Sequence, residues 1–524
     1  MTLALEKIDV LLKCIGLISK TVKGDLALIY HILFNGLSTF TSKPTHLMVM
    51  ERSSEGKTYP VLQIAQHFPK ENVITLGSVT PQAFKYDYGI IVDKNYHPIQ
   101  EKLDHLDEQI KQAKKLEKDS GSTDVAAGVS ALLEQKRQLE GEARYLIDLR
   151  NKWIIFKEPP DQRLLEALYS TLSSDEEYSE HRFVNKESGQ NKTFKVVFRG
   201  TPAILVCTAK DESKNSRWDE TFTRFNIISP TSSSQKYREG MELIAKLYGL
   251  PKELRAEHII SNEEKTTLSI LIGKLIQQIQ ESGGEIINPF LEELHKQFPQ
   301  EAGYRWRQFK RFLTMVDLHC MCYSHCRPKL VINGRIIPVV TKADVIWAFQ
   351  LMKDYDIVPP NKMQWFREIF LPAWRKYGKI VEFGFGNTLE RKVVIGNDIR
   401  TFQIEHNKKQ MSVKQIRESY LETLIEHGIV EKEQDPSNKT RDTYWPTEGY
   451  EDSASSLIAI SSLDESCVSI FKDKYLKGRF EFEFNNRILN DNEIIQYILS
   501  DKNVIDGAES EFKFTNGGTT INDC

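Results

Sequence analysis

The sequence contains no run of about 18 uncharged apolar residues, the length that a membrane-spanning helix needs. Its seven cysteines, scattered from Cys14 to Cys524, are odd in number and do not form the paired framework of a secreted disulfide protein. Glu6 and Asp9 interrupt the apolar residues near the N-terminus, and no small-residue cleavage site follows. We therefore expect a cytoplasmic protein without a membrane partner.

An excess of charge of one sign is also lacking. The 70 Lys and Arg residues against 73 Asp and Glu residues leave a net charge of -3. This balance excludes a global positive field, so any contact with nucleic acid has to come from a local basic face. At roughly 150 residues per domain, a chain of 524 residues predicts three or four domains.

Strands and helices alternate in the first half of the chain. HLMVM (46–50) and NVITL (72–76) have strand character, and YPVLQIAQHF between them has helical spacing of its apolar residues. KWIIF (152–156) and PAILVCT (202–208) predict strands buried in the middle of a sheet. Strands separated by helices favour a parallel sheet with both faces covered, so we expect an α/β fold.

The pattern divides the chain into five segments. In order, we expect a helical lead-in (1–40), an α/β core (41–234) with a helical hairpin inserted at about 98–149, a helical lid (235–356), a C-terminal winged helix-turn-helix domain (357–450) and a final segment of unassigned structure (451–524). The inserted segment is rich in Glu, Lys, Gln and Leu. It predicts a solvated antiparallel helix pair or, alternatively, an arm that docks a protein or a second copy.

The segment ERSSEGKT (51–58) lies between a predicted strand and a predicted helix and ends in Gly56, Lys57 and Thr58. Gly-Lys-Thr closes the phosphate-binding loop of P-loop proteins, where backbone N–H groups and a helix N-terminus face the anion. Glu51 stands at the first glycine position of that pattern and adds a carboxylate near the expected phosphates. We expect nucleotide binding here; the alternative is an ordinary turn with an exposed lysine.

Three further positions fit the chemistry of an ATPase. Glu158 follows a strand where a carboxylate polarises the attacking water, although Lys157 replaces the aspartate that holds Mg²⁺. Thr208, at a strand tip, is placed to touch the γ-phosphate or to cap a turn. Arg224 follows a predicted short helix and is either a contact to a neighbouring subunit's phosphate or a solvated arginine.

The order of these pieces resembles the AAA+ ATPases related to MCM-type replicative helicase motors and to helicase-like ATPase modules of mobile elements. The resemblance covers residues 20–350 and rests on GDLALIYHILFNGLS, SSEGKTY, SVTPQAF, WIIFKEPP, GTPAILVCTAKDE, TRFNIISP, GYRWRQFKRFLTMVDLHCMCYSHCR and TKADVIWAFQLM. It implies ATP and Mg²⁺ as cofactors, and a homo-oligomer. It also implies that phosphate and Mg²⁺ contact Lys57 and Thr58, that Glu158 is the catalytic carboxylate, and that the sensor, the finger and the arginine sensor of the lid are Thr208, Arg224 and Arg307.

Possible zinc ligands crowd into HCMCYSHC, as His319, Cys320, Cys322, His325 and Cys326. Zinc takes such ligands, and Cys322 and Cys326 would share one helix face. The segment has no second ligand pair at a distance and is otherwise apolar. Core packing of small cysteines is therefore the alternative to a metal site.

Residues 411–435, followed by NKTRDTYWP, have the pattern of a winged helix-turn-helix. Ser412 is placed to cap a helix, Gly428 to end it, and Ile429 to begin a wing. Such modules bind DNA or serve as protein–protein domains. The candidate contacts to DNA phosphates are Lys414, Arg417, Lys439 and Arg441.

Together these features predict an ATP-binding AAA+ protein of DNA replication or mobile-element type. It would couple ATP binding and slow hydrolysis to DNA remodelling or translocation. Two alternatives stay open: a non-catalytic, nucleotide-dependent scaffold, and a transcription regulator with a degenerate P-loop.

Overall fold

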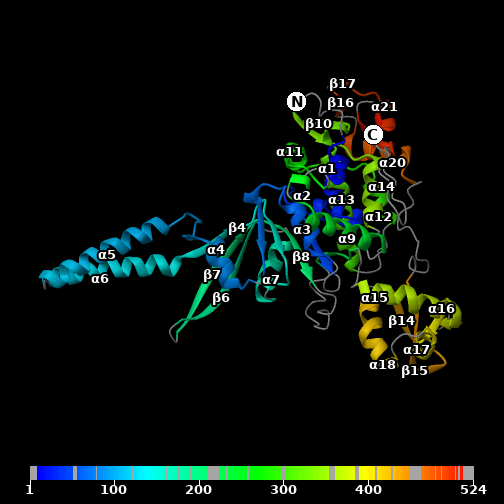
Figure 1. Ribbon diagram of the computed structural model, residues 1–524, viewed down its shortest axis with the longest axis horizontal. Coiled ribbons are helices and arrows are strands. Elements are labelled where there is room, and N and C mark those ends of the chain that lie inside the picture. Colours follow the sequence, from blue (N-terminus) through cyan, green and yellow to red (C-terminus); the bar gives the residue numbers. More distant parts are fainter. Residues whose placement is uncertain are drawn as a thin grey trace. The chain divides into compact units, whose positions relative to one another are not determined.

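The computed structural model describes residues 9–50, 56–77, 79–120, 123–160, 162–173, 177–187, 190–208, 224–230, 234–251, 253–255, 259–297, 303–352, 360–383, 389–406, 410–426, 429–447, 462–477, 480–485, 487–501, 503–505 and 508–510. The chain divides into two compact units, and Figure 1 labels many of their helices and strands. The first unit comprises residues 1–41, 45–70 and 205–524, and the second comprises residues 42–44 and 71–204.

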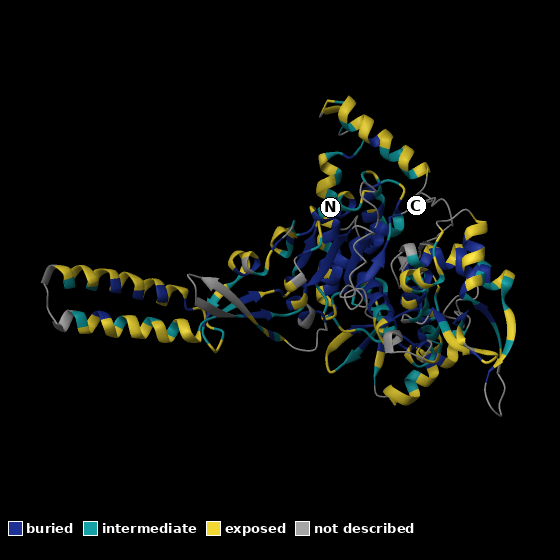
Figure 2. Ribbon diagram, turned by 90° about the horizontal axis from the view of Figure 1, so that it is seen from below, coloured by how far each residue is buried: buried dark blue, intermediate teal, exposed yellow. Residues whose placement is uncertain are grey.

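A parallel sheet forms the centre of the α/β fold. Its strands are β1 (His46–Met50), β2 (Val73–Leu76), β5 (Trp153–Phe156), β8 (Ala203–Thr208) and β9 (Asn226–Ile228), in the order β2-β5-β8-β1-β9. β1 pairs with β9 and β2 pairs with β5, both in parallel. Every residue of β1, β5 and β8 is buried, as apolar strands covered on both faces should be (Figure 2). The expected α/β fold with a parallel central sheet is confirmed.

Helices from distant parts of the sequence meet in the first unit. They are α1 (Val10–Ser19), α2 (Leu26–Ser38), α3 (Thr58–Ala65), α9 (Ser234–Gly249), α11 (Asn262–Glu281), α12 (Leu291–Gln297), α13 (Gly303–Cys322) and α14 (Lys342–Met352). On α2, Tyr30 and Phe34 contact the Trp347 ring of α14, with ring centroids 5.6 and 4.5 Å apart. The predicted lead-in helices therefore share a core with helices from the region 235–356.

The C-terminal segment, whose sequence signals are weak, completes a second sheet in the first unit. Its strand order is β11-β10-β16-β17, so the hairpin of β10 and β11 is extended by two short strands, β16 and β17, from the C-terminal segment. The N–H of Ala343 also donates to the carbonyl oxygen of Ser500 at 3.0 Å. The elements are β10 (Lys329–Ile332), β11 (Arg335–Pro338), α20 (Glu465–Phe471), β16 (Glu481–Phe484), β17 (Arg487–Ile488), α21 (Asp491–Ile498), β18 (Asn503–Ile505) and β19 (Ala508–Ser510).

Residues 360–447 have a core of their own, with buried side chains from every helix of the segment. Ser412 caps a helix and forms a capping box with Gln415, as its position predicts, and a strand begins at Val430. The strand order is β12-β13-β15-β14. The elements are α15 (Pro360–Trp365), α16 (Leu371–Tyr377), β12 (Lys379–Phe383), β13 (Leu389–Ile395), α17 (Gly396–Glu405), α18 (Val413–Ile416), α19 (Glu422–Glu426), β14 (Val430–Asp435) and β15 (Asn438–Pro446), with π-helical turns at 366–370 and 417–421.

The second unit adds a four-stranded sheet with the order β3-β4-β7-β6. β6 and β7 form an antiparallel hairpin closed by the pair Glu187 and Gln190. Besides β2 and β5, the elements are α4 (Pro81–Tyr88), β3 (Ile90–Val92), α5 (Gln100–Ser120), α6 (Thr123–Glu142), β4 (Arg144–Asp148), α7 (Gln162–Tyr169), β6 (Tyr178–Glu187) and β7 (Gln190–Arg199).

The inserted helical hairpin is shorter than its sequence predicts. We expected it to run to residue 149, but α6 ends at Glu142 and β4 follows at Arg144–Asp148. β4 pairs in parallel with β7 and in antiparallel with β3. Tyr145 and Ile147 explain the difference, because aromatic and β-branched side chains favour a strand that has neighbours to pair with.

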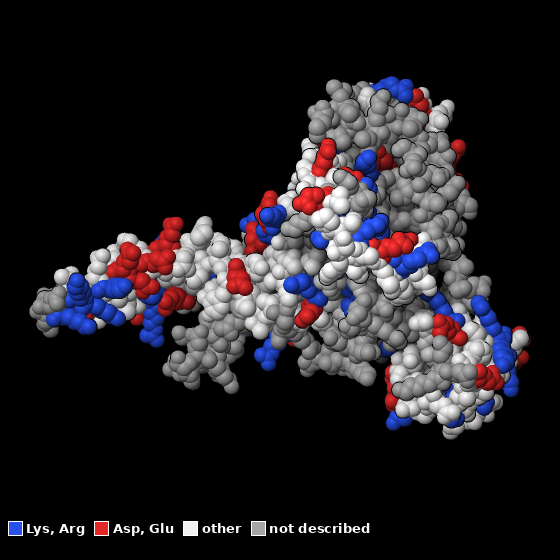
Figure 3. Space-filling model, viewed as in Figure 1, with Lys and Arg blue, Asp and Glu red and all other residues white. Residues whose placement is uncertain are grey.

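The helical part of this insertion is a solvated pair. Leu103, Leu106 and Ile110 of α5 are buried, and so is Val129 of α6, whereas most other positions of both helices are exposed (Figure 2). Charges of both signs lie along the two helices (Figure 3). The pair therefore covers its own apolar stripe. Docking of a partner on this arm stays a prediction.

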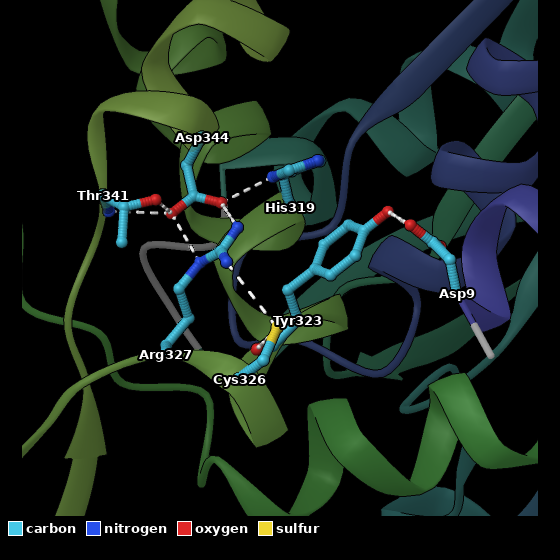
Figure 4. Close-up of polar contacts among 7 residues, drawn as sticks. All are labelled: Asp9, His319, Tyr323, Cys326, Arg327, Thr341 and Asp344. Carbon is cyan, nitrogen blue, oxygen red and sulfur yellow. Dashed lines mark hydrogen bonds and ion pairs between the residues drawn. The ribbon is translucent and has the colours of Figure 1, made fainter. Parts of the chain in front are cut away.

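A buried ionic network holds α13 and α14 together (Figure 4). The Asp344 carboxylate accepts hydrogen bonds from Nε and Nη2 of Arg327 at 3.0 and 2.5 Å, and it lies 2.5 Å from Nδ1 of His319. The N–H of Thr341 donates to the same carboxylate at 2.8 Å. The charge therefore sits in the first turn of α14, where the helix dipole favours an anion.

The network is fully enclosed, with at most 2% of the side chains of His319, Arg327 and Asp344 exposed. Burial is the largest single effect and raises the pKa of Asp344, but the Arg327 guanidinium and the His319 ring together outweigh burial and hold the pKa below its usual range. Burial lowers the pKa of His319, so its ring is neutral at pH 7. The Tyr323 hydroxyl donates to Asp9 at 2.9 Å and so ties the start of α1 to the end of α13.

Removing only the Arg327 cation should strongly destabilise the fold. Arg327→Met leaves the Asp344 carboxylate buried without its partner, and we expect the free energy of unfolding to fall by about 3–5 kcal/mol. The double variant Arg327→Met/Asp344→Leu removes both charges and should recover most of the loss, measured by urea unfolding. A double variant as unstable as the single one would assign the cost to lost packing of the arginine stem.

Candidate functional site

The chain enters α3 through Gly56, Lys57 and Thr58. Gly56 has a φ of 77°, a left-handed conformation that other residues rarely adopt, so the backbone itself requires glycine here. Lys57 is the N-cap residue of α3, and the first turn of this helix carries no acidic side chain. Its N–H groups therefore form a helix end that favours an anion. Glu51 and the rest of 51–55 lie outside the described residues.

The tip of β8 lies against this helix start. The Cys207 thiol donates to the carbonyl oxygen of Lys57 across 4.0 Å, and Thr208 is 3% exposed. Burial raises the pKa of Cys207 to about 11, against the opposing effects of a hydrogen bond with Thr58 and of the Lys57 charge. Lys57, Thr58 and Thr208 are thus brought to one place. Cys207 was not predicted as a site residue, because a cysteine within an apolar strand is usually a core residue.

The end of β9 reaches the same edge. Ser229, which follows β9, donates from its hydroxyl to the carbonyl oxygen of Met50 at 2.7 Å. Met50 is the last residue of β1, so this bond joins the carboxyl ends of the two parallel strands. Nothing in the sequence around Ser229 signalled this contact.

The strand order places a topological switch point at this edge. After β1 the chain continues to β2, which is the strand at one end of the sheet. After β8 it continues to β9, which is the strand at the other end. In open α/β sheets, ligands bind outside the carboxyl ends of the strands where neighbouring connections diverge in this way. The strands β1 and β8 form such a place. Thr208 is the last residue of β8, and Lys57 follows β1 at the start of α3.

Lys157 and Glu158 belong to the second unit and directly follow β5. The Lys157 N–H donates to the carbonyl oxygen of Leu76 at 2.8 Å, which extends the pairing of β5 with β2 by one residue. Both side chains are exposed. Glu158 is therefore open to solvent at the carboxyl end of its strand, and its catalytic role stays a prediction.

The two candidate arginines lie elsewhere in the first unit. Arg224 comes just before β9, at the amino end of a strand that pairs with Leu47 and its neighbours on β1. It therefore lies at the edge opposite to Lys57, roughly 15 Å away along β1 at about 3.3 Å per residue. Arg307 is exposed in the second turn of α13. The predicted helix before Arg224 lies outside the described residues.

Of the cysteine and histidine cluster, His319, Cys320 and Cys322 are buried in a packed core, whereas Cys326 is half-buried and His325 is exposed. Among the described residues, no group of three or more His, Cys, Asp or Glu side chains could hold a metal ion. His319 contacts Asp344, His325 lies 3.0 Å from the Gln278 amide nitrogen, and the Cys326 thiol donates to a carbonyl oxygen at 3.3 Å. The described side chains thus fit the core-packing interpretation.

The basic residues expected to meet DNA have acidic neighbours. Lys414 lies 3.8 Å from Glu418, and Arg417 lies 3.4 Å from Glu422. The Arg441 Nε donates to Asp435 at 2.9 Å, and hydrogen bonds from Ser437 and Arg441 lower the pKa of Asp435 to about 2. Arg441 thus anchors the turn between β14 and β15, whereas Lys414 and Arg417 are in loose pairs. The side chain of Lys439 is outside the described part.

No protein-family model matches this chain, and no curated protein matches it. Among solved structures, the chain is similar to a putative ATPase from Cytophaga hutchinsonii, with 12% sequence identity and a TM-score of 0.32; the match covers 66% of this chain and 85% of that chain. This likeness is too distant to assign an activity. None of the described helices combines the length and apolar composition that a membrane crossing requires.

The geometry at Lys57 predicts binding of a polyphosphate. Lys57→Ala removes the cation at the start of α3, so affinity for ATP should fall at least tenfold, or about 1.4 kcal/mol, in a calorimetric titration. Lys70→Ala is the matched control, because Lys70 is a lysine beyond the other end of α3. Equal ATP affinity in the parent and in Lys57→Ala would reduce the segment to an ordinary turn.

Proposed function

We propose that this chain is a P-loop ATPase of the AAA+ kind that binds ATP at the carboxyl ends of β1 and β8 and acts on DNA. The observation that carries the proposal is the switch point between these strands, with Gly56, Lys57 and Thr58 at the start of α3. Free thiols at Cys14, Cys207 and Cys467 support a reducing compartment such as the cytoplasm.

The residues at this switch point fit a nucleotide. The positive φ of Gly56, the acid-free first turn of α3 and the Lys57 ammonium group would together hold phosphate oxygens. The Thr58 hydroxyl would be a ligand to Mg²⁺, as in P-loop proteins. When bound, ATP would supply the phosphoryl group that hydrolysis transfers to water.

Turnover is proposed to be slow. Glu158 would accept a proton from the attacking water, and Thr208 would orient that water or the γ-phosphate. Lys157 stands where a metal-binding aspartate is expected, and an ammonium group cannot ligate Mg²⁺. This proposal therefore combines ordinary ATP affinity with weakly Mg²⁺-dependent hydrolysis.

We propose that ATPase subunits assemble head to tail. Arg224 lies at the opposite sheet edge from Lys57, so its guanidinium is far from the phosphate site of its own subunit. A neighbouring subunit's phosphate is within its reach only if the subunits meet front to back. Arg307 on α13 is proposed as the second arginine of such a site.

The proposed DNA contact is made by residues 411–445 as a winged helix. The sequence of elements α17, α18–α19, β14 and β15, with β13 paired to β15, supports that comparison. The pairs of Lys414 and Arg417 with glutamates are exposed, and such surface pairs are worth only about 0.2–1 kcal/mol. Replacing each glutamate by a DNA phosphate therefore costs little free energy. A role in replication or in a mobile element is part of the same proposal.

Lys157 and Glu51 favour a second candidate, a nucleotide-dependent scaffold or transcription regulator that does not hydrolyse ATP. Both residues depart from the charge that catalysis needs, one by placing a cation at the metal position and one by placing an anion in the loop. ATP turnover with and without DNA distinguishes this candidate from the ATPase.

Restoring the carboxylate at position 157 should raise turnover. Lys157→Asp supplies the missing Mg²⁺ ligand, so we expect faster hydrolysis with a stronger Mg²⁺ dependence, measured by phosphate release. In the Lys157→Asp background, Glu158→Gln should abolish that gain while leaving ATP bound. A parent chain that already turns over at ordinary motor rates, on the order of ten per second, would contradict this account.

DNA affinity should depend on Lys414 and Arg417. Lys414→Gln/Arg417→Gln removes two phosphate contacts, so affinity for duplex DNA should fall at least tenfold and its salt dependence should become shallower. Fluorescence anisotropy at several salt concentrations measures both effects. Arg441 stays unchanged, because its bond to Asp435 holds the β14–β15 turn.

The control removes the same charge elsewhere in this part of the chain. Arg375→Gln/Lys376→Gln alters two exposed residues at the end of α16. Equal losses in both double variants would mean that DNA responds to net charge alone. An absence of DNA binding by the parent at low salt would favour the scaffold.

A further inference from the structure

Helix α9 displays an apolar face to solvent. Only Leu243 of its 16 residues is buried. The exposed fractions of four apolar residues are 41% for Tyr237, 69% for Met241, 55% for Ile244 and 87% for Tyr248. At the place of α9 in Figure 1, the surface in Figure 3 is largely white with charged side chains beside it. A contiguous apolar patch of this kind on a soluble chain marks an interaction surface.

The four residues form one stripe. Their spacings along the chain are four, three and four, the pattern with which a helix meets another helix in a coiled coil. At about 100° per residue, all four lie within roughly 60° of one another on the helix surface. The exposed Ala245 adds a small residue beside them, and Glu242 and Lys246 lie farther round the helix.

The helix that carries this stripe is anchored at its start. The ammonium group of Lys236 lies 2.8 Å from the Asp25 carboxylate, and only 15% and 2% of these two side chains are exposed. Gly24, with a φ of 63°, lies directly against Lys236; a Cβ at Gly24 would come within 2.8 Å of it. The stripe is therefore presented by a fixed helix and not by a frayed one.

We propose that two copies of this chain pair in antiparallel orientation through α9. In this arrangement Tyr237 faces Tyr248 of the second copy, and Met241 faces Ile244 of the second copy. The stripe is palindromic in both spacing and chemistry, with aromatic residues at its ends and aliphatic residues in its middle. A second copy therefore matches every position, which an unrelated helix would match only by chance.

The area of the stripe sets the strength of the pair. With about 200 Å² for each large side chain, the exposed fractions amount to roughly 500 Å² per copy. Two copies would bury about 1,000 Å², which is below the roughly 1,200–2,000 Å² of stable specific interfaces and in the range of weak, transient ones. The dimer is accordingly reversible, with dissociation in the micromolar range, and each copy remains soluble alone.

This pairing is distinct from the head-to-tail contact proposed for Arg224. It uses the same patch on both copies and closes at two, whereas a head-to-tail contact uses two different patches. α9 pairing therefore does not depend on nucleotide. The Lys57→Ala variant should dimerise like the parent, so a failure of the proposed ATPase function would leave this inference untouched.

The register gives a sharp test by sedimentation velocity on the full chain. Met241→Lys alone and Ile244→Glu alone should each raise the dimer dissociation constant at least tenfold, because each variant places a charge against an apolar residue. An equimolar mixture of the two should recover association to within about threefold, since the introduced ammonium group of one copy then faces the introduced carboxylate of the other. A parallel pair would show no recovery.

Ile488→Glu is the matched control, because Ile488 is 58% exposed on β17, outside α9. It should dimerise like the parent, and circular dichroism should be the same for all variants. A parent that is monomeric up to roughly 100 µM, a dimer that tolerates both single variants, or a mixture without recovery would each overturn the proposal.

Discussion

The candidate site depends on the burial of β1 between β8 and β9. All five residues of β1 are buried, and the strand is paired on both of its edges, so the chain after Met50 can emerge only at the carboxyl edge of the sheet. The left-handed turn at Gly56 then brings it into α3 beside the tip of β8. The strand order therefore brings Lys57 close to Thr208. A flexible loop alone would not hold the two residues together.

The ionic network around Asp344 fixes the positions of the helices in the first unit. Its five hydrogen bonds satisfy one buried carboxylate, and its aromatic neighbours join α2 and α1 to α13 and α14. The same burial raises the pKa of Cys320 and Cys322 well above the ordinary value, which disfavours the thiolate form that zinc binds. The cluster is therefore chemically suited to core packing.

The hairpin α5–α6 and the helix α9 differ in whether their apolar side chains are buried. The hairpin α5–α6 buries Leu103, Leu106, Ile110 and Val129 between its own two helices and presents charges of both signs. α9 is a single helix and has its apolar stripe outward. Its burial has to come from a second helix, and its palindromic pattern makes the same helix of another copy the best match.

The sequence by itself determined the features that depend on near neighbours in the chain. The strands predicted at 46–50 and 152–156, the start of α3 and the Ser412 cap follow from apolar runs and capping residues, and the structure has them within one residue of the predicted positions. Tertiary structure decided the rest. The strand β4 replaces the end of a helix because β3 and β7 offer it hydrogen bonds. β16 forms because it pairs with β10, which is far away in sequence. The same holds for the site: the sequence identifies Lys57 and Thr208 as candidates, but only sheet pairing brings them together, because contact between distant segments is a property of the folded sheet.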